Sequence, residues 1–285
     1  MSTAFSEKIA LVTGTSSGVG LSTAIQLAQS GFIVIATMRD TSKSGALQAR
    51  AQEAGVHIEV RQLDVQQDAS VTNCMQEVSK IHGRIDVLVN NAGAGYLGSL
   101  EQTSADDLRR TMETNFFGVW RVTQAVFPLM RAARSGRILT VTSIGGLIGQ
   151  PFNDAYCAAK FAVEGFMESL APVAKRLGVQ LSIIEPGAIN TSFVDSVQAL
   201  RSESTQELPE EYGQMFESYL AMTQQVFASS GQTPDEVARI IIEAATTDTP
   251  HFRYTTSEMI HGLISRKYVD PTGDSIIALT GSRLS

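Results

Sequence analysis

Short, uninterrupted apolar runs alternate with longer amphipathic stretches along the first two-thirds of the chain. Continuous apolar runs are typical of strands buried on both faces of a parallel sheet. We expect strands at residues 9–12, 32–36, 57–60, 85–89, 138–141 and 181–184, and helices at 19–30, 44–54, 69–82, 105–133 and 155–177. Repeated strand–helix units predict an α/β protein: a doubly wound Rossmann fold with a mainly parallel sheet of about seven strands and helices on both faces.

The strand–helix rhythm lapses after residue 190. Residues 191–230 carry apolar side chains at helical spacing among acidic ones, and we expect one or two helices there that form a substrate lid. A further helix over 234–245 and a short strand near 252–254 follow, and 255–285 forms a C-terminal extension. Because no Pro- or Ser-rich linker interrupts the chain, we expect residues 1–285 to form a single Rossmann-type domain.

Composition excludes several classes of protein. The chain has 285 residues, of which 43% are hydrophobic and 18% charged, so a folded core is expected rather than disorder. Its 22 basic and 29 acidic residues give a net charge of −7, and without a basic run we expect no nucleic-acid partner. No apolar stretch is long enough for a transmembrane segment.

The cysteines and histidines predict neither a disulfide framework nor a metal site. Cys74 and Cys157 show no paired spacing, and the four histidines show no ligand-like spacing. With no secretory signal visible in the first residues, a reduced cytoplasmic setting is the expectation.

A glycine-rich turn follows the first expected strand and opens the first expected helix. Its sequence is TGTSSGVG, residues 13–20. In this context Gly14 would form the tight turn, Gly18 would leave room for a phosphate, and Gly20 would let the helix pack on the strand. Backbone N–H groups there would bind a pyrophosphate at the positive end of the helix. A tight turn without a ligand is the alternative interpretation.

The second expected strand ends in residues that bear on cofactor choice. Thr37 and Met38 stand where NAD enzymes usually place a carboxylate, and Arg39 follows. A guanidinium beside the ribose suits the 2′-phosphate of NADP(H). Asp40 leaves NAD(H) open, because it would either turn toward the ribose or pair with Arg39. A solvated loop charge is the alternative for Arg39.

Tyr156 and Lys160 lie four residues apart in the expected helix 155–177, and therefore on one face of it. An ammonium close to a phenol favours the phenolate and lowers the pKa of the phenol. Taken alone, such a pair is usually an ordinary surface feature. Other polar motifs favour a functional role for this pair. They follow the carboxyl ends of later strands, which is where open α/β sheets bind ligands. These motifs are NNAG at 90–93, Ser143, and Pro186-Gly187 with Thr191, while Asn115 lies in the helix expected at 105–133.

With TGxxxGxG at 13–20, Asp64 after the third strand and YxxxK at 156–160, these motifs resemble the short-chain dehydrogenase/reductase family over residues 7–195. The resemblance implies a catalytic tetrad of Asn115, Ser143, Tyr156 and Lys160. It implies a cofactor site formed by Gly14, Ser16, Ser17, Gly18, Val19, Gly20, Arg39, Asp64, Val65, Asn91, Ala92, Gly93, Tyr156, Lys160, Pro186, Gly187, Ile189 and Thr191. Lys160 would bind the nicotinamide ribose and lower the pKa of Tyr156, and Asn115 would support a proton-relaying water.

Three stretches resemble one branch of the family, that of estradiol 17β-dehydrogenase type 1 and the retinol dehydrogenases. They are IATMRD at 35–40, IIEPGAINTSF at 183–193, and FRYTT at 252–256 with DPTG at 270–273. Met222 departs from this branch, because steroid enzymes often place a polar anchor there. Ser17 also departs, because many NADP-preferring relatives carry a basic residue at that position.

The expected function is therefore an NADP(H)-preferring oxidoreductase that interconverts a bulky apolar ketone and its secondary alcohol, with Tyr156 as general acid and base. Ser143, Leu147, Tyr156, Phe193 and Met222 are the expected substrate contacts, although the apolar ones would equally serve as core. By analogy with relatives, the helices at 105–133 and 155–177 would assemble a homodimer or homotetramer. A dinucleotide-binding sensor without turnover, and an epimerase or dehydratase acting on nucleotide sugars, are the competing readings.

Overall fold

The computed structural model describes residues 8–190, 210–267 and 270–274. Within these ranges a seven-stranded sheet runs in the order β3-β2-β1-β4-β5-β6-β7, and every pairing is parallel. The strands are β1 (Ile9–Thr13), β2 (Ile33–Met38), β3 (Ile58–Gln62), β4 (Val87–Asn90), β5 (Gly136–Val141), β6 (Val179–Glu185) and β7 (Arg253–Thr255). The expected doubly wound fold is confirmed.

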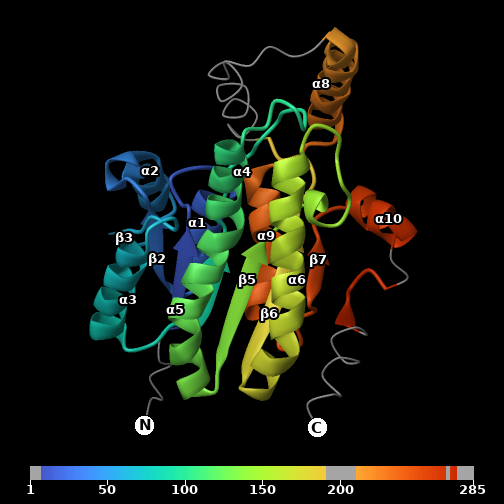
Figure 1. Ribbon diagram of the computed structural model, residues 1–285. Helices are drawn as coiled ribbons and strands as arrows, with labels where there is room; N and C mark the ends of the chain where they lie inside the picture. The colour runs from blue at the N-terminus through green and yellow to red at the C-terminus, as the bar shows by residue number, and fades with distance from the viewer. Residues whose placement is uncertain (1–7, 191–209, 268–269, 275–285) are drawn as a thin grey trace, which may run out of the picture.

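Helices cover both faces of the sheet (Figure 1). The core on one face is shared with α3 (Asp68–His82), α5 (Gly118–Ala133) and α6 (Asp154–Arg176). The core on the other face is shared with α1 (Gly18–Gln29), α2 (Gly45–Glu53) and α9 (Pro234–Thr246). Three further helices are α4 (Ala105–Met112), α8 (Glu210–Ser230) and α10 (Glu258–Lys267). The continuous apolar runs are explained by this sandwich, since all five residues of β1 are buried.

Local sequence signals fix several helix ends. Ser104 and Asp107 form a reciprocal capping box at the start of α4, and Thr233 and Glu236 form another at α9, where Pro234 takes the first helical position. Helix α3 ends at Gly83, which adopts the left-handed conformation with φ 68°. Helices α3 and α9 therefore lie within a few residues of the ranges expected from the sequence, 69–82 and 234–245.

The strand order reverses between β1 and β4, which makes a topological switch point at the carboxyl ends of the strands. The segments that follow β1, β4, β5 and β6 all leave the sheet at this end. Figure 1 shows α8 standing above the same end, beyond the tops of α4 and α6. Ligand chemistry is therefore expected at this edge.

Two elements differ from expectation. The helix expected over 105–133 is divided into α4 and α5 by a π-helix, Glu113–Phe117. For the segment 191–230, the structure describes α8, and residues 191–209 lie outside the described ranges. Among the described helices, none combines the length and the apolar character that a membrane crossing requires.

Candidate active site

The turn after β1 is shaped by two glycines. Gly14 has φ +72°, a conformation that side chains rarely adopt. A Cβ on Gly20 would lie 2.2 Å from the Gly14 carbonyl oxygen and 2.4 Å from Asn91 Nδ2, so only glycine fits at that point. Asn91 Nδ2 donates to the carbonyls of Thr13 (2.9 Å) and Gly14 (3.0 Å). The turn is thus held directly by the segment that follows β4.

The same turn fits the phosphates of a dinucleotide. Ser17 is the N-cap residue of α1, and its side chain makes no cap hydrogen bond. No acidic side chain lies in the first turn of α1, and Ser17 is exposed. Unsatisfied N–H groups at the positive end of a helix bind anions. Gly14, Ser16, Ser17, Gly18, Val19 and Gly20 are therefore the residues that would hold the pyrophosphate.

Ser143, Tyr156 and Lys160 converge where β5 gives way to α6. The Ser143 hydroxyl is the N-cap of a 3₁₀ turn, Ile144–Gly146, and accepts from the Gly145 N–H (3.0 Å). Ser143 also hydrogen-bonds the Tyr156 hydroxyl. Lys160 Nζ lies 5.7 Å from the centre of the Tyr156 ring and donates to the Val141 carbonyl (3.1 Å). The structure therefore brings three of the expected catalytic side chains together.

Burial dominates the acid–base properties of this group. It raises the pKa of Tyr156 to about 12, partly offset by the hydrogen bond from Ser143. It lowers the pKa of Lys160 to about 8, and the Glu164 carboxylate opposes this shift. The sequence-based expectation that Lys160 lowers the pKa of Tyr156 is not met by the protein side chains alone: burial raises that pKa, and the opposing contribution comes from Ser143.

Asn115 lies inside the π-helix and is completely buried. Its Nδ2 donates to the carbonyls of Ala94 (2.9 Å) and Thr111 (3.0 Å), and its Oδ1 accepts from the Ala94 N–H (3.1 Å). A Cβ placed on Gly93 would be 3.0 Å from Asn115 Oδ1 and 3.7 Å from Lys160 Nζ. Asn115 therefore fixes the segment after β4 beside Lys160, and Asn91, Ala92 and Gly93 border the same space.

The segment after β3 is tied to the π-helix by Arg121, which the sequence did not single out. Arg121 Nη1 donates to the Val65 carbonyl (2.5 Å), Nη2 contacts Glu113 Oε1 (2.8 Å), and Nε contacts Asp68. A Cβ on Gly118 would lie 2.8 Å from Val65 Cγ2. Asp64 and Val65, both expected in the cofactor site, are thereby held against the helix that carries Asn115.

Arg39 and Asp40 take different roles at the end of β2. Arg39 is exposed. The Asp40 carboxylate accepts from the Ser42 N–H (3.0 Å) and the Ser42 hydroxyl (2.7 Å), and so caps the following 3₁₀ turn. The Ser42 contacts hold the pKa of Asp40 below its usual range. Asp40 is therefore engaged locally, and its pairing with Arg39 is not seen among the ion pairs of the described residues.

The remaining expected contacts follow β6 and β5. Pro186 is buried, Gly187 and Ile189 are partly buried, and a Cβ on Gly187 would lie 2.7 Å from Ile260 Cδ1. Leu147 is 2% exposed and packs with Ile260 and Ile264, not against the pocket described next. The expected contacts Thr191 and Phe193 lie outside the described residues.

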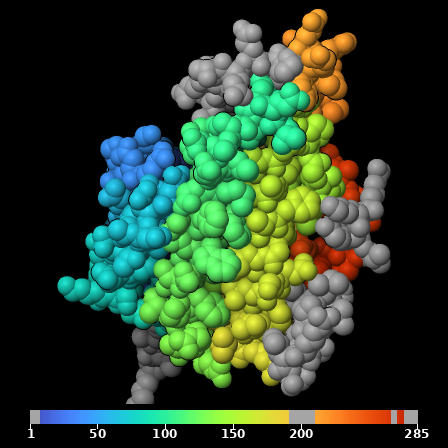
Figure 2. All heavy atoms as spheres, viewed as in Figure 1, coloured from blue at the N-terminus to red at the C-terminus, as the bar shows by residue number. Residues whose placement is uncertain are grey.

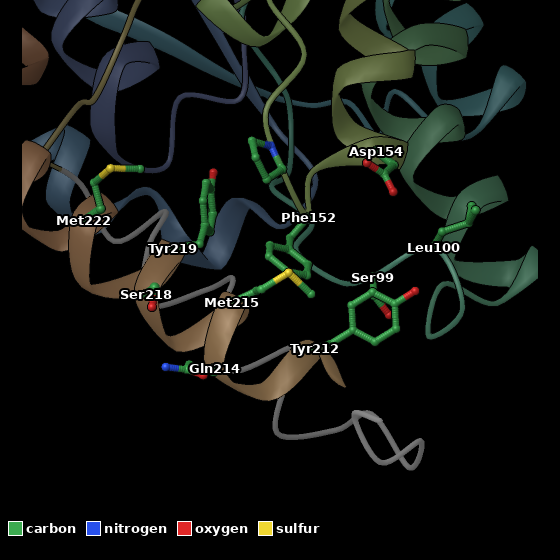
Figure 3. A pocket seen from close by; sticks show the side chains of 11 residues that line it. Ser99, Leu100, Phe152, Asp154, Tyr212, Gln214, Met215, Ser218, Tyr219 and Met222 are labelled. Atoms are coloured by element: carbon green, nitrogen blue, oxygen red, sulfur yellow. The ribbon is translucent and has the colours of Figure 1, made fainter. Parts of the chain in front are cut away.

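A pocket of about 760 Å³ opens between α8 and the loops that precede α4 and α6 (Figure 3). Phe152, Met215, Tyr219 and Met222 are among its walls, and Met222 is 60% exposed. The remaining lining residues are Ser99, Leu100, Pro151, Asp154, Tyr212, Gln214 and Ser218. Of the expected substrate contacts, Met222 lies here.

The loop that precedes Tyr156 forms the floor of this pocket. Phe152 has φ 59° and packs edge-on against Phe216 of α8, with ring centres 4.9 Å apart. Asn153 Nδ2 donates to the Tyr219 hydroxyl (2.7 Å). Ser99 and Leu100 carry no motif, so sequence reasoning missed them. Tyr212 and Gln214 belong to the apolar-patterned lid segment and were detectable only as part of it.

The chain is similar in sequence to proteins of known family. Residues 8–202 match the family described as short chain dehydrogenase. The chain is 39% identical over 275 residues to human 17-beta-hydroxysteroid dehydrogenase type 1, covering 94% of this chain and 83% of that protein. It is 40% identical over 271 residues to bovine retinol dehydrogenase 8, covering 92% of this chain and 86% of that protein.

A solved structure supports the same relationship. A metagenomic short-chain oxidoreductase in complex with NADP is 25% identical, with a TM-score of 0.68, covering 87% of this chain and 96% of that one. The family match spans well over half of the chain. With the glycine turn and the Ser143–Tyr156–Lys160 group at the switch point, the chain belongs to the short-chain dehydrogenase family of oxidoreductases, in the neighbourhood of the 17β-hydroxysteroid and retinol dehydrogenases.

Proposed function

We propose that this protein interconverts bulky apolar ketones and their secondary alcohols, that it prefers NADP(H), and that Tyr156 is its general acid and base. The observation that carries the proposal is the position of Tyr156. Its hydroxyl is hydrogen-bonded to Ser143, and its ring centre lies 5.7 Å from Lys160 Nζ. The loop that leads into it, with Phe152 and Asp154, lines an apolar pocket.

Each catalytic side chain has a role that its contacts support. When bound, the nicotinamide supplies or accepts hydride at the substrate carbon. The Tyr156 hydroxyl gives its proton to the carbonyl oxygen in reduction and takes it back in oxidation. The Gly145 N–H fixes Ser143 Oγ beside the Tyr156 hydroxyl, where the Ser143 O–H can orient the same substrate oxygen.

The ammonium of Lys160 offsets the phenolate charge left on Tyr156 and binds the nicotinamide ribose. Asn115 holds the segment beside Lys160 and supports a water that relays protons to it. Because the pKa of Lys160 is lowered to about 8, the ammonium form is lost as the pH rises through that value. Reduction should therefore slow on the alkaline side.

The end of β2 supports the cofactor preference. One oxygen of the Asp40 carboxylate, Oδ1, accepts both Ser42 hydrogen bonds, which turns Asp40 toward its own loop. Arg39 is exposed, and Lys43 in the following turn adds a second positive charge. A guanidinium recognises a phosphate monoester through charge-assisted hydrogen bonds.

The pocket supports an apolar substrate. Phe152, Met215, Tyr219 and Met222 are large and adaptable side chains. No Lys or Arg occurs between Arg201 and Arg239 in the sequence, so α8 offers no clamp for a carboxylate or phosphate. The nearby carboxylate of Asp154 would repel an anionic substrate. We assign 191–230 the role of a substrate lid on a single Rossmann-type domain of residues 1–285, with 255–285 as its C-terminal extension.

A panel of ketones tests this function. NADPH consumption at 340 nm should give a kcat/KM that rises from short aliphatic to aryl and polycyclic ketones, since each buried CH₂ contributes ~0.8 kcal/mol. Adding a carboxylate to the same skeleton should lower kcat/KM sharply. A flat series, or faster turnover of the charged analogues, would contradict the apolar pocket. No NADPH consumption with any ketone would contradict the function itself.

An apolar face on α5 and α6 supports a homo-oligomer. Trp120 and Phe161 are 44% and 37% exposed, and Trp120 stacks on Phe166 with ring centres 4.4 Å apart. In Figure 2 the atoms of α5 and α6 form one broad, continuous face. Exposed aromatic clusters of this kind are typical of protein interfaces. We propose that two copies pack there as a homodimer, alone or within a homotetramer.

Light scattering tests the homo-oligomer. Trp120→Glu should halve the mass of the assembly, because a carboxylate would be buried against its partner's apolar face. Ile81→Glu is the matched control, since Ile81 is 58% exposed on α3 and belongs to neither α5 nor α6, and it should leave the mass unchanged. A monomeric wild type, or an undiminished Trp120→Glu assembly, would refute the proposed interface.

The two cysteines support a reducing setting for the reaction. Cys74 and Cys157 are both free and buried. Burial raises the pKa of the Cys74 thiol to about 11, which keeps it protonated and unreactive. We therefore propose that the protein is located in the cytoplasm, and the free, buried thiols are the observation that supports this location.

A further inference from the structure

A buried ionic cluster lies directly behind the catalytic group. Arg253 on β7 contacts Glu164 of α6, Glu185 at the end of β6 (2.5 Å) and Glu168 of α6 (2.9 Å). The side chains of Glu164 and Glu185 are only 6% and 0% exposed. One oxygen of each, Glu164 Oε1 and Glu185 Oε2, is buried with no hydrogen-bond partner among the described residues. Burying two carboxylates against one guanidinium is costly.

Glu164 touches the catalytic segments on two sides. It lies one helical turn after Lys160 on α6. A Cβ on Gly146 would lie 3.0 Å from Glu164 Cγ and 3.2 Å from Glu164 Oε1, so the side chain packs against the 3₁₀ turn that Ser143 caps. The Thr142 hydroxyl also hydrogen-bonds Glu164. A shift of this carboxylate would therefore move the backbone on which Ser143 is mounted.

Glu185 connects the cluster to a third segment. It is the last residue of β6 and directly precedes Pro186 and Gly187, which border the proposed cofactor site. Arg253 therefore links α6, β6 and β7 behind the proposed active site. The more exposed Glu168, at 38%, shares Arg253 but lies one turn farther along α6.

We propose that Glu164 is a positioning residue of the active site: held by Arg253, it fixes the Ser143 turn and places a negative charge one helical turn from Lys160. This inference rests on the proposed function, because it assigns Glu164 an effect on the same Lys160. Glu164 touches neither the substrate nor the cofactor and acts through its neighbours. Glu185 is the second carboxyl that Arg253 holds, and it keeps the cluster joined to β6.

The charges around Lys160 give the sign of the effect. The groups concerned are Tyr156, Lys160, Glu164 and Glu168 on α6, Glu185 on β6 and Arg253 on β7. Burial, and after it the adjacent Glu164, raise the pKa of Glu185 to about 8 against the opposing effect of Arg253. Burial raises the pKa of Glu164 as well, and Arg253 and Thr142 oppose that shift. Arg253 acts on both carboxyls but Thr142 on Glu164, so at neutral pH we take Glu164 as the charged partner and Glu185 as the protonated one.

Neutralising Glu164 should lower the pKa of Lys160, because a nearby carboxylate stabilises the ammonium. In Glu164→Gln, the alkaline fall in kcat for ketone reduction should move to lower pH by on the order of one unit. Glu168→Gln is the matched control: it removes a carboxylate that contacts the same Arg253, and it should leave the profile in place. Glu164→Asp keeps the charge but withdraws it from the Ser143 turn, so it should lower kcat and retain the wild-type inflection.

Circular dichroism and thermal melts establish which variants are folded, and Glu164→Asp decides the matter if Glu164→Gln does not fold. NADPH fluorescence across the same pH range gives a readout without turnover, since Lys160 binds the ribose in the proposed site. A folded Glu164→Gln with an unmoved profile would overturn the inference, as would a Glu164→Asp with undiminished kcat. A wild type that binds NADPH but reduces no ketone would instead contradict the proposed function, while the pH dependence of binding would still report on Glu164.

Discussion

Tyr156→Phe should lower ketone reduction by ~10²–10⁴-fold while NADPH binding stays near wild type. The substitution removes the transferable proton but keeps the ring that lies 5.7 Å from Lys160 Nζ. The Ser143 hydroxyl, anchored by the Gly145 N–H, still orients the oxygen, so some residual rate is expected. Stopped-flow measurement of NADPH oxidation, alongside fluorescence titration of NADPH, separates the chemical step from binding.

Tyr254→Phe is the matched control for this experiment. Tyr254 is a buried tyrosine of β7 whose hydroxyl accepts from the His251 N–H (3.0 Å). Its loss should reduce the free energy of unfolding by about 1 kcal/mol and leave turnover unchanged. If Tyr156→Phe reduced ketones at the rate of Tyr254→Phe, another group would have to supply the proton.

Arg39→Ala should erode a preference for NADP(H) over NAD(H) by about 10–150-fold, mainly through the KM for NADP(H). A charge-assisted contact to a 2′-phosphate contributes ~1.5–3 kcal/mol. The neighbouring Asp40 cannot replace it, because a carboxylate repels a phosphate. The KM for NAD(H), which lacks this phosphate, should change little.

Arg109→Ala is the control for a simple loss of positive charge. Arg109 lies on α4, 75% exposed and paired with Asp106, away from the end of β2. Steady-state kinetics with both cofactors should show no change in preference for this variant. Equal use of the two cofactors by the wild type would refute the assignment to Arg39, and Asp40→Asn would then be the variant to examine.

Much of the fold was predictable because its signals are local. Continuous apolar runs identified the buried strands, and the helices α1, α3 and α6 fall within a few residues of the expected ranges. The motifs that follow the strands also converge at the switch point, because parallel strands deliver their carboxyl ends to one edge. The expected catalytic tetrad, in contrast, came from the resemblance to the short-chain dehydrogenases and not from spacing alone.

The features that were missed depend on contacts between distant segments. The π-helix around Asn115 is accompanied by hydrogen bonds from that side chain to Ala94, which no helical periodicity encodes. The pairing of Arg253 with Glu164 and Glu185 joins β7 to α6 and β6, and single charged residues in apolar surroundings give no sign of their partners. The pKa of Tyr156 was misjudged for a similar reason, since burial is a property of the whole site.

Helix α8 is attached differently from the elements that carry the site, so substitutions in the two places should have different consequences. Phe216 is the one buried residue of this helix, and it rests on Phe152, whereas Ser143, Asn115 and Lys160 belong to the packed interior of the sheet and its helices. Replacing Met215 or Met222 alters the pocket wall and costs the core almost no folding free energy. Under the proposed function, substrate range can therefore drift in evolution, or be redesigned, along one exposed helix while the proposed hydride chemistry is left intact.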